Sequence, residues 1–356
     1  MLDPTLRHWL DGHAEALDLG HCDPEQVLPR LAAAGLPGVG VAPTLGGTGG
    51  TLQDAVETIA SVAEHSLTAA FVLWGQRAFI EYLLQSPNAA LRERLLKPLL
   101  DGRLAGATGL SNAMKFLSGI ESLQVDARPT AEGWTLDGRL PWVTNLRKGG
   151  FVVAAAIAHA GDGAPFVAAI PDGLDGLQRS DDLALLGLQS SNTAALTLTR
   201  LQLERDWLLH EDARQFLPVV RPAFLGLQCG LAIGLARCAL AEVETHLGGS
   251  RSVLAAELVQ HRQALEGWVG ELKSGLGGAT FNSQPAALFR LRIALAEAAA
   301  DAVQLELQAS GGKAYLQAHG GAFARRWRES AFVPIVTPSL VQLRTELNRQ
   351  AKGAVA

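Results

Sequence analysis

The stretch GWTLDGRLPWVTN, residues 133–145, is the most informative part of the sequence. Asp137-Gly138 is a two-residue hairpin signal, because a type I′ turn needs a positive φ at both central residues. The flanking residues are rich in Trp, Thr, Leu and Val, as strands are. On the predicted return strand, Trp142 and Thr144 are two residues apart, so their side chains leave the same face. A flat ring beside a hydroxyl suits a flat heteroaromatic ligand, although a core tryptophan and a strand-end threonine would give the same pattern.

Length and composition are those of an ordinary globular protein. The chain has 356 residues, enough for two or three domains, with 48% hydrophobic and 18% charged residues. The net charge of −5 gives no electrostatic reason to expect binding to nucleic acid or to an anionic membrane. Three sparse cysteines indicate a reducing compartment without disulfides, and no metal site is expected. No signal peptide is visible, so we expect a cytoplasmic protein.

The character of the chain changes twice, which predicts three domains at residues 1–105, 106–211 and 212–356. The first and third are helical, and the third is expected to be a helical bundle. The middle domain has short apolar and alternating runs without helical crossovers, which predicts an antiparallel sheet that forms a small barrel. The predicted helices span residues 24–34, 52–66, 69–85, 89–100, 222–247, 254–276 and 285–309, with another starting at 337. The predicted strands span residues 134–136, 140–144, 151–158, 166–170 and 194–203.

Six short motifs follow one another along the chain. They are LGGTGG at 45–50, GRLPWVTN at 138–145, NT at 192–193, GLARCAL at 234–240, QASGGKAY at 308–315 and RRWRESA at 325–331. Together with the three-part order, they resemble the acyl-CoA dehydrogenase superfamily of flavoproteins over essentially the whole chain. The resemblance implies an α+β fold with an N-terminal helical domain, a middle antiparallel β-barrel domain and a C-terminal four-helix bundle.

The resemblance also implies a flavin cofactor. FAD is the expected form, with FMN or reduced flavin as alternatives. Trp142 would flank the isoalloxazine ring, and Thr144 would form a hydrogen bond near its N5 edge. Ser111 falls where the family has a threonine at the pyrimidine end of the flavin. Ser118 falls near the serine that contacts phosphate.

Other positions that match the family imply an oligomer. Arg251 falls near the arginine that reaches the FAD pyrophosphate from a neighbouring subunit, and its fork matches phosphate oxygens. Gln308, Gly311 and Gly312 would form a turn that approaches the cofactor, although two glycines also suit a helix C-cap. Ser339 falls where a family threonine touches the adenosine. Because some of these residues would act across a subunit boundary, a homodimer or homotetramer is implied.

The sequence departs from the resemblance at the catalytic base. Dehydrogenation of an acyl-CoA needs a carboxylate general base. The two positions where the family places this glutamate are occupied by Thr337 and Phe224. His65, His261 and His319 lie near the motifs, but a lone helical histidine is more often a surface or core residue. The catalytic residues therefore stay unknown at this point.

Three functions remain open from the sequence. The first is FAD-dependent oxidation of the CH–CH group of an acyl-CoA or similar acyl substrate, with an electron-transfer flavoprotein as partner. The second is a monooxygenase on the same fold, supplied with reduced flavin by a reductase. That chemistry needs a dry, apolar pocket, for which Phe224, Phe116 and Leu117 are suited. The third is a non-catalytic, flavin-binding member of the family.

Overall fold

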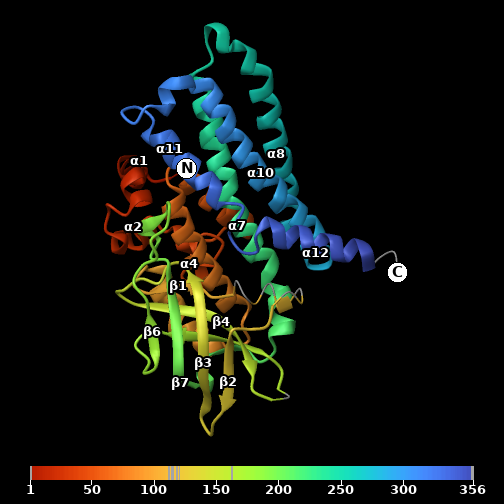
Figure 1. The fold of residues 1–356 in the computed structure, drawn as a ribbon. Helices are drawn as coiled ribbons and strands as arrows, with labels where there is room; N and C mark the ends of the chain where they lie inside the picture. Colours follow the sequence, from red (N-terminus) through yellow and green to blue (C-terminus); the bar gives the residue numbers. More distant parts are fainter. Residues whose placement is uncertain are drawn as a thin grey trace.

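The computed structural model describes residues 2–110, 113, 116, 117, 119, 121–161 and 163–353. An open sheet lies beside the N-terminal helices, and long C-terminal helices extend away from the sheet (Figure 1). The predicted order of helices, sheet and helices is confirmed. Within the described residues, the secondary structure changes between Leu100 and Ala105 and again between His210 and Ala213. These changes lie close to the predicted domain boundaries.

The N-terminal helices begin where the sequence supplies caps. Helix α1 (Pro4–Leu19) starts after Asp3, whose carboxylate accepts backbone N–H groups of the first turn. Helix α3 (Leu52–Ala63) starts with a capping box that includes Thr51. Helix α4 (Leu67–Gln85) is buried along nearly its whole length, so it forms the centre of this region. The other elements are η1 (Pro24–Gln26), α2 (Val27–Ala33), η2 (Leu36–Gly38), η3 (Pro43–Leu45) and α5 (Ala89–Leu100).

The middle of the chain forms one sheet. Its strands are β1 (Ala105–Thr108), β2 (Val125–Pro129), β3 (Gly133–Val143), β4 (Phe151–His159), β5 (Phe166–Pro171), β6 (Leu177–Arg179), β7 (Ala194–Glu204) and β8 (Leu208–His210). The order is β6-β7-β3-β2-β4-β5-β8, and β1 and β2 both pair with β4 in parallel. The predicted antiparallel barrel is therefore corrected to an open, mixed sheet. It does not close because β1 and β2 share β4 as a partner, which leaves β6 and β8 at the two ends of the order. The 3-10 turns η4 (Gln189–Ser191) and η5 (Arg205–Trp207) flank β7.

The predicted hairpin at Asp137-Gly138 is wrong, because β3 runs through both residues. Gly138 has a φ of 150°, and a Cβ there would lie 2.2 Å from the carbonyl oxygen of Gln124. The Asp137 carboxylate accepts the backbone N–H of Arg200 on β7 at 2.8 Å, where the pairing of β3 with β7 shifts register. Asp-Gly therefore forms a bulge that bends a long strand, not a turn that reverses it.

The C-terminal region contains the longest helices. They are α7 (Ala213–Thr245), α8 (Ala255–Gly277), α10 (Pro285–Ser310), α11 (Gly321–Phe332) and α12 (Leu340–Gly353), with short elements η6 (Gly249–Leu254), α9 (Thr280–Ser283) and η7 (Gly311–Tyr315) between them. Helices α7, α8 and α10 pack against one another, and α12 packs against α10 (Figure 1). Helix α7 starts nine residues before the predicted start at Pro222. Asp212 caps the helix, and Pro218 and Pro222 are both accommodated within it.

Helix α7 connects the C-terminal helices to the N-terminal ones. Gly230 and Gly234 allow a close approach to α3, since a Cβ at Gly234 would lie 2.1 Å from the carbonyl oxygen of Ala60. Among the described residues, α7 is the one helix long and apolar enough to cross a membrane by length and composition alone. Its most apolar window is 89% buried inside the protein, as expected for a core helix.

A buried amide connects α4 to the sheet. Gln76, on α4, donates hydrogen bonds to the carbonyl oxygens of Leu99 (2.8 Å) and Leu104 (3.0 Å). Its side-chain oxygen accepts the backbone N–H of Gly106 on β1 (2.6 Å) and the side-chain N–H of Asn145 (2.9 Å). Asn145 directly follows the Trp-Val-Thr sequence at the end of β3. This amide therefore fixes the end of β3 relative to α4.

Replacing this amide tests its importance for the fold. Gln76→Ala leaves four hydrogen bonds unmade in a buried position, so we expect the free energy of unfolding to fall by about 3 kcal/mol. Gln85→Ala, on the same helix but exposed, should change it by less than about 0.5 kcal/mol. Urea denaturation of both variants measures the two values. Equal effects of the two substitutions would contradict the role given to Gln76.

Candidate functional site

A cavity of about 540 Å³ lies where α4, the sheet and the end of α11 meet. Its mouth carries exposed apolar side chains: Trp142 is 63%, Leu186 91% and Ile335 66% exposed. Most of the lining is apolar, and the polar side chains in it are four threonines and Arg328. The lining residues are Phe71, Trp74, Thr108, Trp142, Thr144, Ala184, Leu185, Leu186, Gly187, Leu188, Thr193, Arg328, Ala331, Phe332, Ile335, Val336 and Thr337.

The structure brings Trp142 and Thr144 to the same cavity. Trp142 is exposed at the rim, whereas Thr144 is only 3% exposed. The Thr144 hydroxyl donates to the carbonyl oxygen of Ser191 at 3.2 Å. Gly75 on α4 makes room for this threonine, because a Cβ on Gly75 would lie 3.2 Å from Thr144 Cγ2. The close approach of α4 therefore fixes the position of Thr144.

A buried arginine holds the wall formed by residues 333–337. Arg292 on α10 donates to the side-chain oxygen of Gln228 (2.7 Å) and to the carbonyl oxygen of Val333 (2.8 Å). Gln228 in turn donates to the carbonyl oxygen of Thr337 at 3.1 Å. Both ends of the wall are thus bound to one pair of side chains. Burial lowers the pKa of Arg292.

A buried aspartate holds the opposite wall. Asp18, at the end of α1, accepts the backbone N–H of Leu188 (2.8 Å) and the guanidinium of Arg328 (2.8 and 2.6 Å). Leu188 and Arg328 both line the cavity. Because Asp18 neutralises Arg328, the one charged side chain of the described lining is already paired.

Ion pairs also fix α11 in the core. Glu329 accepts the guanidinium of Arg325 (2.8 Å) and the backbone N–H of Leu67 at the start of α4 (3.2 Å). Burial raises the pKa of Glu329 above the ordinary range for glutamate. Arg326 forms two hydrogen bonds to Glu306 on α10, at 2.8 and 2.6 Å. Helix α11 is therefore bound on several sides, and the cavity wall that follows it is well positioned.

Comparisons with known proteins agree with this architecture. Residues 5–103 match the family model for the acyl-CoA dehydrogenase N-terminal domain. The structure superposes on butyryl-CoA dehydrogenase of Megasphaera elsdenii with a TM-score of 0.84 and 19% identity, over 98% of this chain and 96% of the other. Residues 5–103 thus match the acyl-CoA dehydrogenase N-terminal domain, and the whole chain has the fold of butyryl-CoA dehydrogenase.

Two further proteins resemble this chain, one in part of its sequence and one in its fold. Benzylmalonyl-CoA dehydrogenase of Aromatoleum aromaticum is 29% identical over 150 residues, which cover 42% of this chain and 39% of that protein. The match thus spans well under two thirds of that relative. A KijD3 protein, whose structure contains FMN and a dTDP-linked sugar, superposes with a TM-score of 0.80 and 20% identity, over 98% of this chain and 91% of the other.

The remaining positions that match the superfamily's cofactor residues lie away from the cavity. Arg251 donates to the carbonyl oxygen of Ser310 at 3.4 Å, beside Gly311. Gln308 is exposed at the end of α10, and Gly312 follows in the same turn. The turn precedes α11, whereas the cavity lies at the last turn of this helix, which has 12 residues and a length of roughly 18 Å.

Other predicted residues have structural roles or lie outside the described residues. Ser111 and Ser118 lie outside them. Ser339 accepts the backbone N–H of Gln342 at 3.4 Å, and its own N–H donates to the Gln342 side chain at 2.8 Å, so it caps α12. Phe224 lies behind the cavity, where its carbonyl oxygen accepts Trp74 Nε1–H at 3.3 Å.

The candidate histidines do not line the cavity. His65 pairs with Asp11 at 2.6 Å, and His261 lies 3.8 Å from Glu257 on the same helix. His319 follows η7, near the Gly311 turn. In the described part of the chain, no three His, Cys, Asp or Glu side chains gather as they would around a metal ion.

The sequence did not indicate several of the residues that line the cavity. Leu186 and Gly187 belong to a loop whose sequence carries no motif, and Phe71 and Trp74 read as ordinary core residues of an apolar helix. One signal was available: Gln76 is an amide in the middle of that apolar helix, and a buried amide needs partners.

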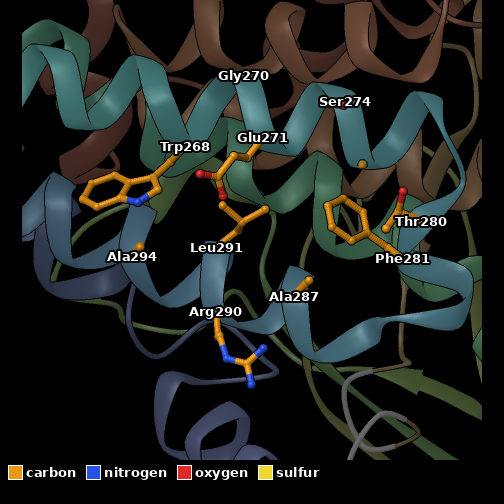
Figure 2. A pocket seen from close by; sticks show the side chains of 11 residues that line it. Trp268, Gly270, Glu271, Ser274, Thr280, Phe281, Ala287, Arg290, Leu291 and Ala294 are labelled. Atoms are coloured by element: carbon orange, nitrogen blue, oxygen red, sulfur yellow. The ribbon is translucent and has the colours of Figure 1, made fainter.

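A second cavity of about 670 Å³ lies between α8 and α10. Trp268 and Glu271 project from α8 toward α10, and Arg290 points away from α8 (Figure 2). None of the residues that match the superfamily's cofactor positions lines this cavity. The first cavity is therefore the better candidate for the functional site.

The close packing at Gly75 gives a testable prediction. In Gly75→Ala the added methyl must displace Thr144, so we expect the free energy of unfolding to fall by about 1–2 kcal/mol. Gly12→Ala, in helix α1 with no heavy atom within 4 Å of the added Cβ, should raise it by about 0.5–1 kcal/mol. Chemical denaturation of both variants checks the opposite signs. If Gly75→Ala left the free energy of unfolding unchanged, the close approach of α4 would not fix the position of Thr144.

Proposed function

We propose that the chain is a flavin-dependent oxidoreductase and that the flavin ring binds in the cavity beside Trp142 and Thr144. The observation that carries the proposal is the exposed face of Trp142 at the mouth of an otherwise apolar cavity. Trp142 is exposed together with Leu186 and Ile335 around one cavity, and apolar side chains grouped in this way mark ligand-binding grooves. The volume of about 540 Å³ lies in the range of small-molecule sites.

FAD is the proposed form of the cofactor, and a homodimer or homotetramer is the proposed assembly. Arg251 offers a guanidinium beside the backbone of Gly311, a pairing that suits a diphosphate. This second group of residues is separated from the cavity of its own chain by the length of α11. A single FAD could use both groups if a second copy of the chain supplied the second one.

The chemistry we propose is monooxygenation with reduced flavin supplied by a separate reductase. Reduced flavin, when bound, supplies the electrons for the reaction with oxygen. The chain contributes a dry site, since apolar side chains form most of the described lining. Thr337 stands where a dehydrogenase of the superfamily would need a carboxylate, and no carboxylate belongs to the described lining.

The hydrogen bond of Thr144 also supports a reduced ligand. While its hydroxyl donates to Ser191, the Thr144 oxygen has only lone pairs to offer a ligand. A lone pair fits an N–H group at N5, the edge proposed to face Thr144; reduced flavin carries a hydrogen on N5 and oxidised flavin does not.

This preference can be measured directly. Wild-type protein should bind reduced FAD at least about tenfold more tightly than oxidised FAD, a difference expected for one buried hydrogen bond. Thr144→Val should remove most of the preference, and Thr144→Ser should keep it. Anaerobic equilibrium titrations with both redox forms give the ratios. Equal affinities in the wild type would argue against reduced flavin as the ligand form.

Flavin binding itself has a separate test. Trp142→Ala removes the wall against which the ring would lie, so we expect FAD to bind about tenfold more weakly. Trp142→Phe should retain most of the affinity. Trp207→Ala is the matched control. Trp207 lies in η5, outside the cavity, and its ring stacks on Arg94, so this variant should bind FAD as the wild type does. If Trp142→Ala and Trp207→Ala behave alike, the flavin does not lie against Trp142.

Dehydrogenation of an acyl-CoA is the second candidate, favoured by the match to benzylmalonyl-CoA dehydrogenase. It would use an electron-transfer flavoprotein as acceptor and would need a base. Two buried carboxylates lie next to the described lining: Asp18 bonds to the lining residue Arg328, and Glu329 follows Arg328 in the sequence. Both carboxylates accept hydrogen bonds from arginines.

A non-catalytic flavin-binding protein is the third candidate. It would bind reduced flavin without speeding the consumption of oxygen.

A further inference from the structure

Four aromatic rings gather at the buried end of the cavity. Phe71 and Trp74 come from α4, Phe332 from the end of α11, and Phe224 from α7. We propose that these rings limit the depth of the cavity, so that the substrate is compact, uncharged and ring-shaped, and extended chains are excluded. This inference rests on the proposed function, because it concerns the substrate that would bind beside the flavin.

The exposure of the lining residues defines an open end and a closed end. Trp142, Leu186 and Ile335 are all more than half exposed. Phe71 and Trp74 line the same cavity but are only 7% and 3% exposed. The two rings therefore belong to the buried part of the lining, together with Thr108, Thr144, Leu188, Thr193 and Val336.

The rings contact one another across three helices. The centroids of Phe71 and Trp74 are 5.3 Å apart in a stacked arrangement. Phe71 meets Phe332 edge to face at 4.8 Å, and Trp74 meets Phe224 at 5.3 Å with tilted planes. These separations are those of direct ring contact. The rings thus fill the space in which α4, α7 and α11 converge.

A hydrogen bond holds the central ring in place. Trp74 Nε1 donates to the carbonyl oxygen of Phe224 at 3.3 Å, and both residues are buried. Rotation of Trp74 would leave its N–H group without a partner in the core, which is unfavourable. An extended chain could pass between α4 and α7 only by moving this ring. The inner end of the cavity is therefore a fixed wall.

The chemistry of the remaining lining narrows the substrate class. Flat aromatic walls favour a ring over a flexible chain, because stacked rings gain contact without loss of chain entropy. Arg328 is already paired with Asp18, so the described lining offers no free charge to an ionic group. Its hydroxyl groups suit a substrate that carries a neutral polar substituent. This combination is typical of a phenolic or otherwise substituted ring.

The test uses two alcohols of equal carbon count, phenylethanol and n-octanol, as probes of shape. Calorimetric titration of the full chain should show phenylethanol binding about tenfold more tightly than octanol. Trp74→Ala opens the inner end, so the ratio should fall toward unity. Trp207→Ala is the matched control and should keep the wild-type ratio. Phe71→Ala, which removes the ring stacked on Trp74 and also opens the inner end, serves if Trp74→Ala does not fold.

Two results would overturn the inference. One is equal or tighter binding of octanol to the wild type, and the other is an unchanged ratio in whichever of Trp74→Ala and Phe71→Ala folds. The titrations are made with and without FAD. Absence of FAD binding would end the proposed function, whereas the alcohol ratio without FAD still reports the depth of the cavity.

Discussion

The hydrogen bond between Gln76 and Asn145 is the constraint on which the site depends. It joins the most buried helix of the N-terminal region to the residue after Thr144. The same Asn145 amide reaches the carbonyl oxygen of Gly106, so α4, β1 and β3 meet at one point. Because buried amides must be paired, these elements have one favourable arrangement. The positions of Trp142 and Thr144 follow from it.

The walls of the cavity are held by the same kind of interaction on other sides. Asp18 joins α1, the loop before Leu188 and α11, while Arg292 and Gln228 hold the wall that contains Thr337. In each case a buried polar group from a distant part of the chain bonds to backbone of the wall. Buried hydrogen bonds consequently hold the described walls of the cavity, and the lining presents mostly apolar surface inward. Such a site selects ligands by shape more than by charge.

The sequence predicted the order of helices and sheet and the position of most helices. It did so because caps and apolar periodicity are local signals, as at Asp23-Pro24 and Ala89–Leu100. The closed barrel and the Asp137-Gly138 hairpin were wrong, because strand pairing is set by distant partners such as Arg200. The spacing of Trp142 and Thr144 predicted that their side chains share a face, and both side chains line the same cavity. The aromatic rings around Trp74 were missed, since nothing local separates a lining ring from a core ring.

The central proposal is that this chain binds flavin in a cavity whose wall carries Thr337 where an acyl-CoA dehydrogenase would need a carboxylate base. The most direct test is an anaerobic absorbance titration of the FAD-loaded protein with acyl-CoA esters of several chain lengths. We expect the flavin band to keep its intensity with every ester, because no group in the described lining can remove the proton. Bleaching of the band by any ester would contradict the account and show that a base acts from another position.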